Sequence, residues 1–157
     1  MDKVIVTALL VIGAVTAAVV TIMTLAPAVS VSSQATASAA QEASSRILTS
    51  IEIIAVASNS DGTAVDAWVK NVGAAPILGI AKSDVFIITP GTRYDAMTHA
   101  ASGDNSWTEQ PPDSAWNRGD TLHMSITLAA GAPLALGDHS LRISTPNGVI
   151  AEKFFSR

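Results

Sequence analysis

Residues 4–25, VIVTALLVIGAVTAAVVTIMTL, decide the fold of this chain. The stretch holds no charged residue, and as a helix its 22 residues would span about 33 Å, enough to cross the hydrocarbon core of a bilayer. The next charged residue is Glu42, so the uncharged run continues well past the length that a membrane needs. We therefore expect a long N-terminal rod that carries a head of different composition.

Three interpretations of the apolar stretch stay open: a cleaved secretory signal, a permanent single-pass anchor, and a helix that packs against copies of itself. A conventional signal is disfavoured, because Lys3 is its only basic residue, Asp2 cancels that charge, and the apolar run is longer than usual. As an anchor, the stretch would place its N-terminus in the cytoplasm and the head outside, since Lys3 lies on the short side.

Small residues four positions apart favour the self-packing interpretation. Gly13 with Ala17, and Ala14 with Ala18, would let helix backbones approach closely, and the stretch lacks the interfacial Trp or Tyr of many anchors. Small residues are also common in ordinary anchors, which is the plainer explanation. The predicted helix-packing residues of a filament core are Ile5, Leu9, Gly13, Ala14, Ala17, Ala18, Thr21 and Pro27.

Residues 26–45 are polar but almost free of helix breakers. No glycine lies between Gly13 and Gly62, and Pro27 is the only proline in that interval. We predict one helix from about residue 3 to residue 46, bent near Pro27, because alanine favours helix and an internal proline removes a backbone hydrogen bond. Such a helix is marginal alone and needs neighbours. A disordered Ser/Ala stalk is the alternative. The predicted domains are the N-terminal helix, 1–46, and the head, 47–157.

The head has the alternation and turn chemistry of short strands. Strands are predicted at 47–57, 65–71, 85–89, 121–128, 140–144 and 149–155, with a further one within 92–105 and a loop at 109–113. In 65–71, Val65, Ala67 and Val69 point inward and Trp68 outward; in 121–128 the even-numbered residues point inward. The fold class is therefore α+β: a long hydrophobic helix followed by an antiparallel immunoglobulin-like β-sandwich.

Composition argues against most kinds of chemistry. The net charge of −4 does not suit nucleic acid, and the absence of cysteine excludes disulfides and thiolate sites. His99, His123 and His139 share no metal-ligand spacing, and no nucleophile elbow or phosphate-binding loop is present. We predict no catalytic residue, no metal, no cofactor and no enzyme.

Five fragments of the head carry a family resemblance: residues 68–73 (WVKNVG), 83–87 (SDVFI), 116–122 (WNRGDTL), 137–143 (GDHSLRI) and 144–149 (STPNGV). Behind a type IV pilin-like helix, their order resembles the archaellins and the archaellum stator-type accessory proteins. The residues that carry the resemblance in the head are Trp68, Asn71, Gly73, Asp84, Phe86, Trp116, Gly119, Gly137 and Gly148.

The resemblance implies a structural subunit of an extracellular, rotated swimming filament, a homopolymer that lies in the cytoplasmic membrane before assembly. It also implies a class III signal peptidase, an assembly ATPase and a membrane platform protein as partners. Bacterial type IV pilins resemble one another in a Glu at the fifth mature position, but the stretch Val4-Ile5-Val6 of this chain contains none. No Asn-x-Ser/Thr sequon occurs either, although archaellins are often N-glycosylated. A membrane-anchored stator-type protein with an envelope-binding head and an adhesive pilin remain alternatives.

Overall fold

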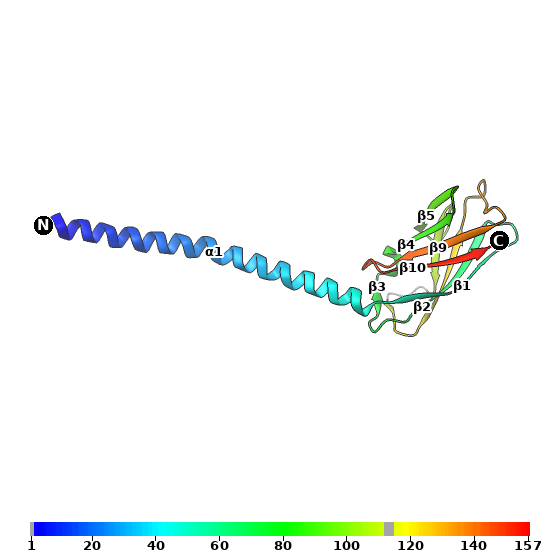
Figure 1. Ribbon diagram of the computed structural model, residues 1–157, viewed down its shortest axis with the longest axis horizontal. Helices are drawn as coiled ribbons and strands as arrows, with labels where there is room; N and C mark the ends of the chain where they lie inside the picture. The colour runs from blue at the N-terminus through cyan, green and yellow to red at the C-terminus, as the bar shows by residue number, and fades with distance from the viewer. Residues whose placement is uncertain (1, 112–114) are drawn as a thin grey trace. The chain divides into compact units, whose positions relative to one another are not determined.

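The computed structural model describes residues 2–111 and 115–157 and divides the chain into two compact units, up to Ala43 and from Ser44 onward. Helix α1 runs from Asp2 to Leu48 and continues through Pro27 (Figure 1). A bend at Pro27 stays a prediction. The helix ends two residues later than expected, so the strand predicted from residue 47 is wrong in its first part. Its last turn is held by backbone hydrogen bonds from the head, which sequence periodicity does not report.

Ten strands follow in the described part of the head. Their bounds are β1 Ile51–Ser58, β2 Ala64–Asn71, β3 Ile77–Leu78, β4 Asp84–Thr89, β5 Arg93–His99, β6 Ser106–Gln110, β7 Ala115–Trp116, β8 Thr121–Thr127, β9 Asp138–Ser144 and β10 Ile150–Ser156, with a 3-10 turn at Ile80–Lys82. The expected strands at 65–71, 85–89, 121–128 and 149–155 are confirmed within one residue at each end, and the strand expected at 140–144 is confirmed but begins two residues earlier. The strand expected within 92–105 is β5.

Eight strands form one sheet in the order β1-β2-β8-β6-β5-β4-β9-β10, and β3 and β7 pair separately. All neighbours are antiparallel except β5 and β6, which pair in parallel at Thr98–Ser106 and His99–Trp107. At the open edge, Lys153 Nζ of β10 donates a hydrogen bond to Ile54 O of β1 at 2.9 Å. The sheet is thus nearly barrel-like.

The immunoglobulin-like sandwich is therefore not the observed arrangement. One wall of the sheet consists of β1, β2, β8 and β6, and the other of β5, β4, β9 and β10. A sandwich would keep these walls as separate sheets, but here hydrogen bonds between β5 and β6 join them. Alternation predicts which side chains point inward, but both architectures bury the same alternate positions, so the pattern does not distinguish them.

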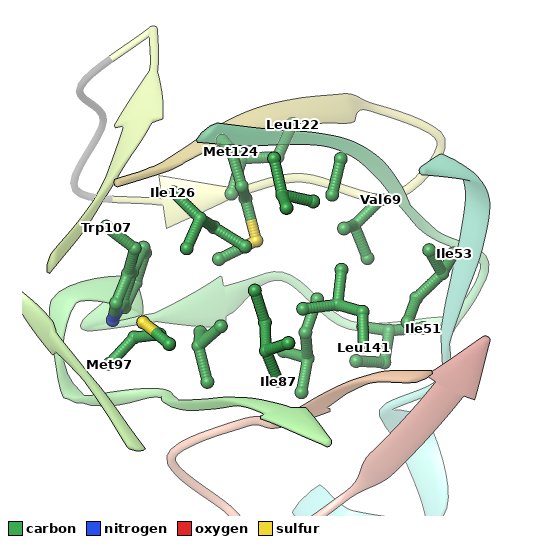
Figure 2. Packing of buried hydrophobic residues seen from close by; sticks show 14 of the residues in the cluster. Ile51, Ile53, Val69, Ile87, Met97, Trp107, Leu122, Met124, Ile126 and Leu141 are labelled. Atoms are coloured by element: carbon green, nitrogen blue, oxygen red, sulfur yellow. The ribbon is translucent and has the colours of Figure 1, made fainter. Parts of the chain in front are cut away.

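The core lies between the walls (Figure 2). Val65, Ala67 and Val69 are fully buried and Trp68 is partly exposed, as predicted. The inward residues predicted in 121–128 are confirmed as well: Leu122, Met124 and Ile126 of β8, and Leu128 just after it, are buried.

The loop predicted at 109–113 is wrong at its start, because Glu109 and Gln110 belong to β6 and pair with Met124 and His123 of β8. The rest of that loop falls largely on residues 112–114, which lie outside the described residues. Trp107 of β6, 1% exposed, is a core residue that the sequence pattern did not identify.

Candidate functional site

The apolar surface of α1 is the first candidate site. Every Val, Ile, Leu and Met side chain from Val4 to Leu25 is exposed, and the helix is long and apolar enough to cross a membrane. Single exposed apolar side chains are common on proteins, but a continuous surface of this size marks contact with lipid or protein. The structure thus identifies a surface that has to be covered.

The threonines of this span are compatible with an apolar environment. Thr7, Thr16, Thr21 and Thr24 each donate a side-chain hydrogen bond to the carbonyl oxygen four residues before, at 2.8–3.1 Å. A hydroxyl that enters lipid or a protein bundle without a partner would carry a desolvation cost. Because the helix satisfies these hydroxyls itself, either environment is open to it.

The predicted helix-packing residues all lie on this exposed helix: Ile5, Leu9, Gly13, Ala14, Ala17, Ala18, Thr21 and Pro27. No contact within the described chain explains Gly13, since a β-carbon there would meet nothing within 4 Å. Glycine in a helix interior costs about 1 kcal/mol relative to alanine. Its presence would be explained by close approach of another molecule, so the packing role stays a prediction.

The second candidate site lies where α1 ends, inside the compact unit of the head. Asn71, fully buried, donates from Nδ2 to Ala75 O at 3.0 Å and to Trp116 O at 2.9 Å. Its Oδ1 accepts from Gly73 N at 3.0 Å, and its carbonyl accepts from Gly119 N at 2.8 Å. Four of the residues that carry the family resemblance therefore form one hydrogen-bonded cluster.

The loop after Asn71 caps the end of the helix. Gly73 N donates to Ser50 O at 2.9 Å, and Ala74 N donates to Leu48 O at 2.8 Å. The last carbonyls of a helix have no partner within it, so the bond to Leu48 O satisfies a group that would otherwise be orphaned. A β-carbon on Gly73 would lie 2.6 Å from Leu48 O and Ser50 N, so only glycine fits here.

The turn between β9 and β10 holds the same helix end from another side. Asn147 Nδ2 donates to Ser45 O at 3.3 Å and to Thr49 Oγ1 at 2.5 Å. Arg46 donates from its guanidinium to Gly148 O at 3.4 Å. We call residues 44–50, 71–75 and 145–149 the neck.

The remaining residues of the resemblance do not join the neck. Trp68 lies on the outer face of β2 and stacks on His123, with ring centroids 5.0 Å apart. Asp84 and Phe86 lie on β4, and Gly137 exchanges backbone hydrogen bonds with the last residue of the chain. Sequence reasoning missed the role of Asn147, because nothing in its local sequence signals a contact with Ser45 and Thr49, about 100 residues away.

The buried histidine of the head has a structural partner on each ring nitrogen. His139 is 1% exposed and lies between Thr89 Oγ1, at 2.7 Å from Nδ1, and Ala135 O, at 2.9 Å from Nε2. Since a carbonyl only accepts, Nε2 carries the proton there. In residues 2–111 and 115–157 no group of three or more His, Asp or Glu side chains is arranged to hold a metal ion.

Comparison with known proteins gives consistent results. The family model "Archaeal-type flagellin" matches residues 2–153. An uncharacterized protein of Archaeoglobus fulgidus is 31% identical over 159 residues, covering 98% of each chain. Among solved structures, the archaeal flagellum of Methanospirillum hungatei strain JF1 matches with a TM-score of 0.72 at 14% identity, over 96% of this chain and 90% of that one.

The archaellum periplasmic stator protein FlaG of Sulfolobus acidocaldarius matches with a TM-score of 0.59 at 24% identity, over 69% of this chain and 100% of that one. At these identities, the two structural likenesses concern the fold.

Proposed function

The chain belongs to the archaeal-type flagellin family, and from that premise we propose that it is a subunit of an extracellular helical filament, polymerised through α1 and rotated for swimming. Members of this family are structural components of the archaellum and not enzymes. In this proposal the subunit waits in the cytoplasmic membrane with its head outside, and then enters the filament.

The observation that carries the proposal is the length and exposure of α1. Residues 4–25 suffice for a membrane, yet the helix continues to Leu48 through a stretch rich in Ala, Ser and Gln. At about 1.5 Å per residue, the 47 residues of α1 extend about 70 Å, against about 30 Å of hydrocarbon. An ordinary anchor has no use for the second half, whereas a bundle of parallel helices supplies neighbours along the whole length.

The apolar half suits both environments in turn. Its backbone is satisfied within the helix and its threonine hydroxyls bond to their own backbone, so transfer from lipid to a protein bundle breaks no hydrogen bond. Cohesion then comes from close packing at small residues, repeated at every subunit. By its family, the chain would be processed by a class III signal peptidase and assembled by an ATPase and a membrane platform protein.

A stator-type accessory protein is the second candidate, because the head has the fold of a periplasmic stator protein over that chain's whole length. Such a protein would stay anchored and bind the cell envelope. Abundance separates the two functions, since a filament subunit dominates the material sheared from cells. Negative-stain microscopy of that material, with mass spectrometry of the filament band, is the direct test. An adhesive pilin would also give filaments, but its deletion would leave swimming intact.

A volume change at Ala17 distinguishes a packed helix from an anchor. Ala17→Leu keeps the helix apolar, so membrane insertion is unaffected, but it adds volume where we propose backbones to approach closely. We expect membrane-bound protein and no filaments. Val19→Leu, a change between two large residues in the same span, is the matched control and should leave filaments normal.

Ala17→Glu should abolish filaments too, with the isolated head still folded. Normal filaments from either Ala17 variant would refute the packing model.

A further inference from the structure

The turn between β9 and β10 contains the dipeptide Asn147-Gly148, in which an asparagine directly precedes a glycine. None of the other four asparagines of the chain precedes a glycine. Asparagine is a chemically labile residue, and glycine has no side chain to keep its backbone nitrogen away from the amide before it. Asn147 is therefore the asparagine of this chain best suited to deamidation through a cyclic imide.

The reaction needs only the chain and water. The backbone nitrogen of Gly148 attacks Cγ of Asn147, the bond from Cγ to Nδ2 breaks, and ammonia leaves with the proton of the attacking nitrogen. Water then opens the imide ring. Cleavage of the bond between the nitrogen and Cγ gives aspartate, whereas cleavage of the main-chain bond gives isoaspartate, whose backbone runs through Cβ and Cγ. One ammonia is lost and one water is consumed, without an oxidant or a reductant.

In the closed neck, hydrogen bonds hold both reacting groups. Gly148 N donates to Thr145 O at 2.8 Å, and Asn147 Oδ1 accepts from Thr145 Oγ1 at 2.6 Å. Asn147 Nδ2 donates to Ser45 O at 3.3 Å and to Thr49 Oγ1 at 2.5 Å. Cyclisation turns the amide toward Gly148 N and removes the proton from that nitrogen, so these bonds have to break first. The reaction therefore requires a local opening of the neck.

The end of α1 and the residue after it hold this dipeptide in place. Thr49 is only 6% exposed, and its hydroxyl also donates to Ser45 O at 2.8 Å, so the acceptor for the asparagine amide is itself fixed. From the same turn, the Arg46 guanidinium donates to Gly148 O at 3.4 Å. Fraying of this turn would release both residues of the dipeptide together. Helix ends open in this way at a free energy below that of global unfolding.

We propose that Asn147 is a deamidation site that the closed neck protects and that local opening of the neck exposes. The inference concerns a single chain and does not depend on filament formation. Its failure would leave the proposed function standing, and the absence of filaments would leave the inference standing.

The products cannot restore the bonds of the neck. An aspartate oxygen in the place of Nδ2 has no proton to donate to Ser45 O. Isoaspartate lengthens the backbone inside a turn that Thr145 N closes by donating to Val149 O at 2.9 Å. Because the ammonia is lost, the change is permanent, and a chain that has reacted keeps a loosened neck.

The first test compares the folded chain with a peptide that has no neck. Trypsin cuts after Arg142 and Lys153 and releases residues 143–153, in which Asn147 is the only asparagine. The full chain in detergent micelles is kept in mildly alkaline buffer, and mass spectrometry of this fragment follows deamidation with time. A synthetic peptide of residues 143–153 gives the unprotected rate. We expect the folded chain to react at least about tenfold more slowly, because several hydrogen bonds have to break first.

Two outcomes of this comparison would overturn the inference. A peptide that stays intact would show that the dipeptide is not reactive, and equal rates in the chain and the peptide would show that the neck gives no protection. This test needs no variant, so it decides the proposal even where a substitution prevents folding.

The second test removes one hydrogen-bond acceptor from the neck. Thr49→Val keeps the shape of the side chain but cannot accept from Asn147 Nδ2, and it should speed deamidation about threefold to tenfold. Thr49→Ser keeps the hydroxyl and should react at the wild-type rate. Thr92→Val, in the exposed turn at the far end of β4 from Asp84, is the matched control and should also keep that rate.

Tryptophan fluorescence confirms that each variant is folded. A folded Thr49→Val chain that reacts no faster than wild type would overturn the role of the neck in protection.

The third test examines the product. Deamidated chains are separated from intact ones by ion exchange, and amide hydrogen exchange is compared between the two. Residues 44–50 should exchange faster in the deamidated chains, since the bonds from Asn147 Nδ2 to Ser45 O and Thr49 Oγ1 are gone. Equal exchange in the two samples would refute a permanently loosened neck.

Discussion

Replacing Asn71 with alanine should destabilise the head more than any exposed substitution, because one side chain holds three main-chain groups inside the protein. The amide is fully buried, bonds two carbonyl oxygens at 3.0 and 2.9 Å, and accepts from Gly73 N at 3.0 Å. Alanine removes the amide partner of the two carbonyl oxygens, whereas Gly73 N keeps its bond to Ser50 O. A buried polar group that loses its partner costs about 1–3 kcal/mol, so the expected loss is on the order of 4 kcal/mol.

That loss is large against the roughly 5–15 kcal/mol by which a domain is stable. For a head of this size, it corresponds to a fall in the unfolding midpoint of about 15–25 °C. The assay is thermal and urea unfolding of residues 44–157, a compact unit that contains all three tryptophans as fluorescent reporters. Asn117→Ala, at an exposed asparagine nearby, is the matched control and should change stability by less than about 0.5 kcal/mol.

The reasoning would be refuted if Asn71→Ala lowered the unfolding free energy by less than about 1 kcal/mol. The helix-capping loop would then hold its shape without the asparagine, and the neck would be stabilised mainly by packing.

Three further outcomes follow from the neck and from the Arg142–Glu152 pair. Gly73→Ala should destabilise the head by about 2 kcal/mol or more in urea unfolding, because its β-carbon would press on the backbone at Leu48. Asn147→Ala should speed amide hydrogen exchange in residues 44–50, since its amide bonds Thr49 and the last turn of α1. Hydrogen bonds from Ser140 and Arg142 lower the pKa of Glu152 below its ordinary 4.5. The ionised carboxylate therefore stabilises the folded head above pH 4.5, and this contribution is lost as the pH falls through the lower pKa of the folded state. The stability difference between wild type and Glu152→Gln should therefore shrink in acid, by a small amount for so exposed a group.

The parts of the fold that were predictable rest on local chemistry. The helix follows from a run with no charge between Lys3 and Glu42 and no glycine between Gly13 and Gly62, and the strands of the head follow from alternation such as that of β8. The turn residues around Gly62 and Gly148 delimit strands in the same way. Each of these signals lies within a few residues of the structure that it predicts.

The errors came where a partner distant in sequence decides the outcome. The helix extends to Leu48 because the loop after Asn71 caps it, and Glu109 is in a strand because β8 lies beside it. The neck brings together Thr49, Asn71 and Asn147, whose separate motifs gave no sign that they meet.

The sequence by itself therefore determined a long apolar helix, an antiparallel head and their order along the chain, since these depend on composition and period. Only the tertiary structure decided that the two walls join into one nearly closed sheet and that the last turn of the helix belongs to the head. Those features depend on hydrogen bonds and register between different segments of the chain, up to 102 residues apart, about which the period of any one strand carries no information.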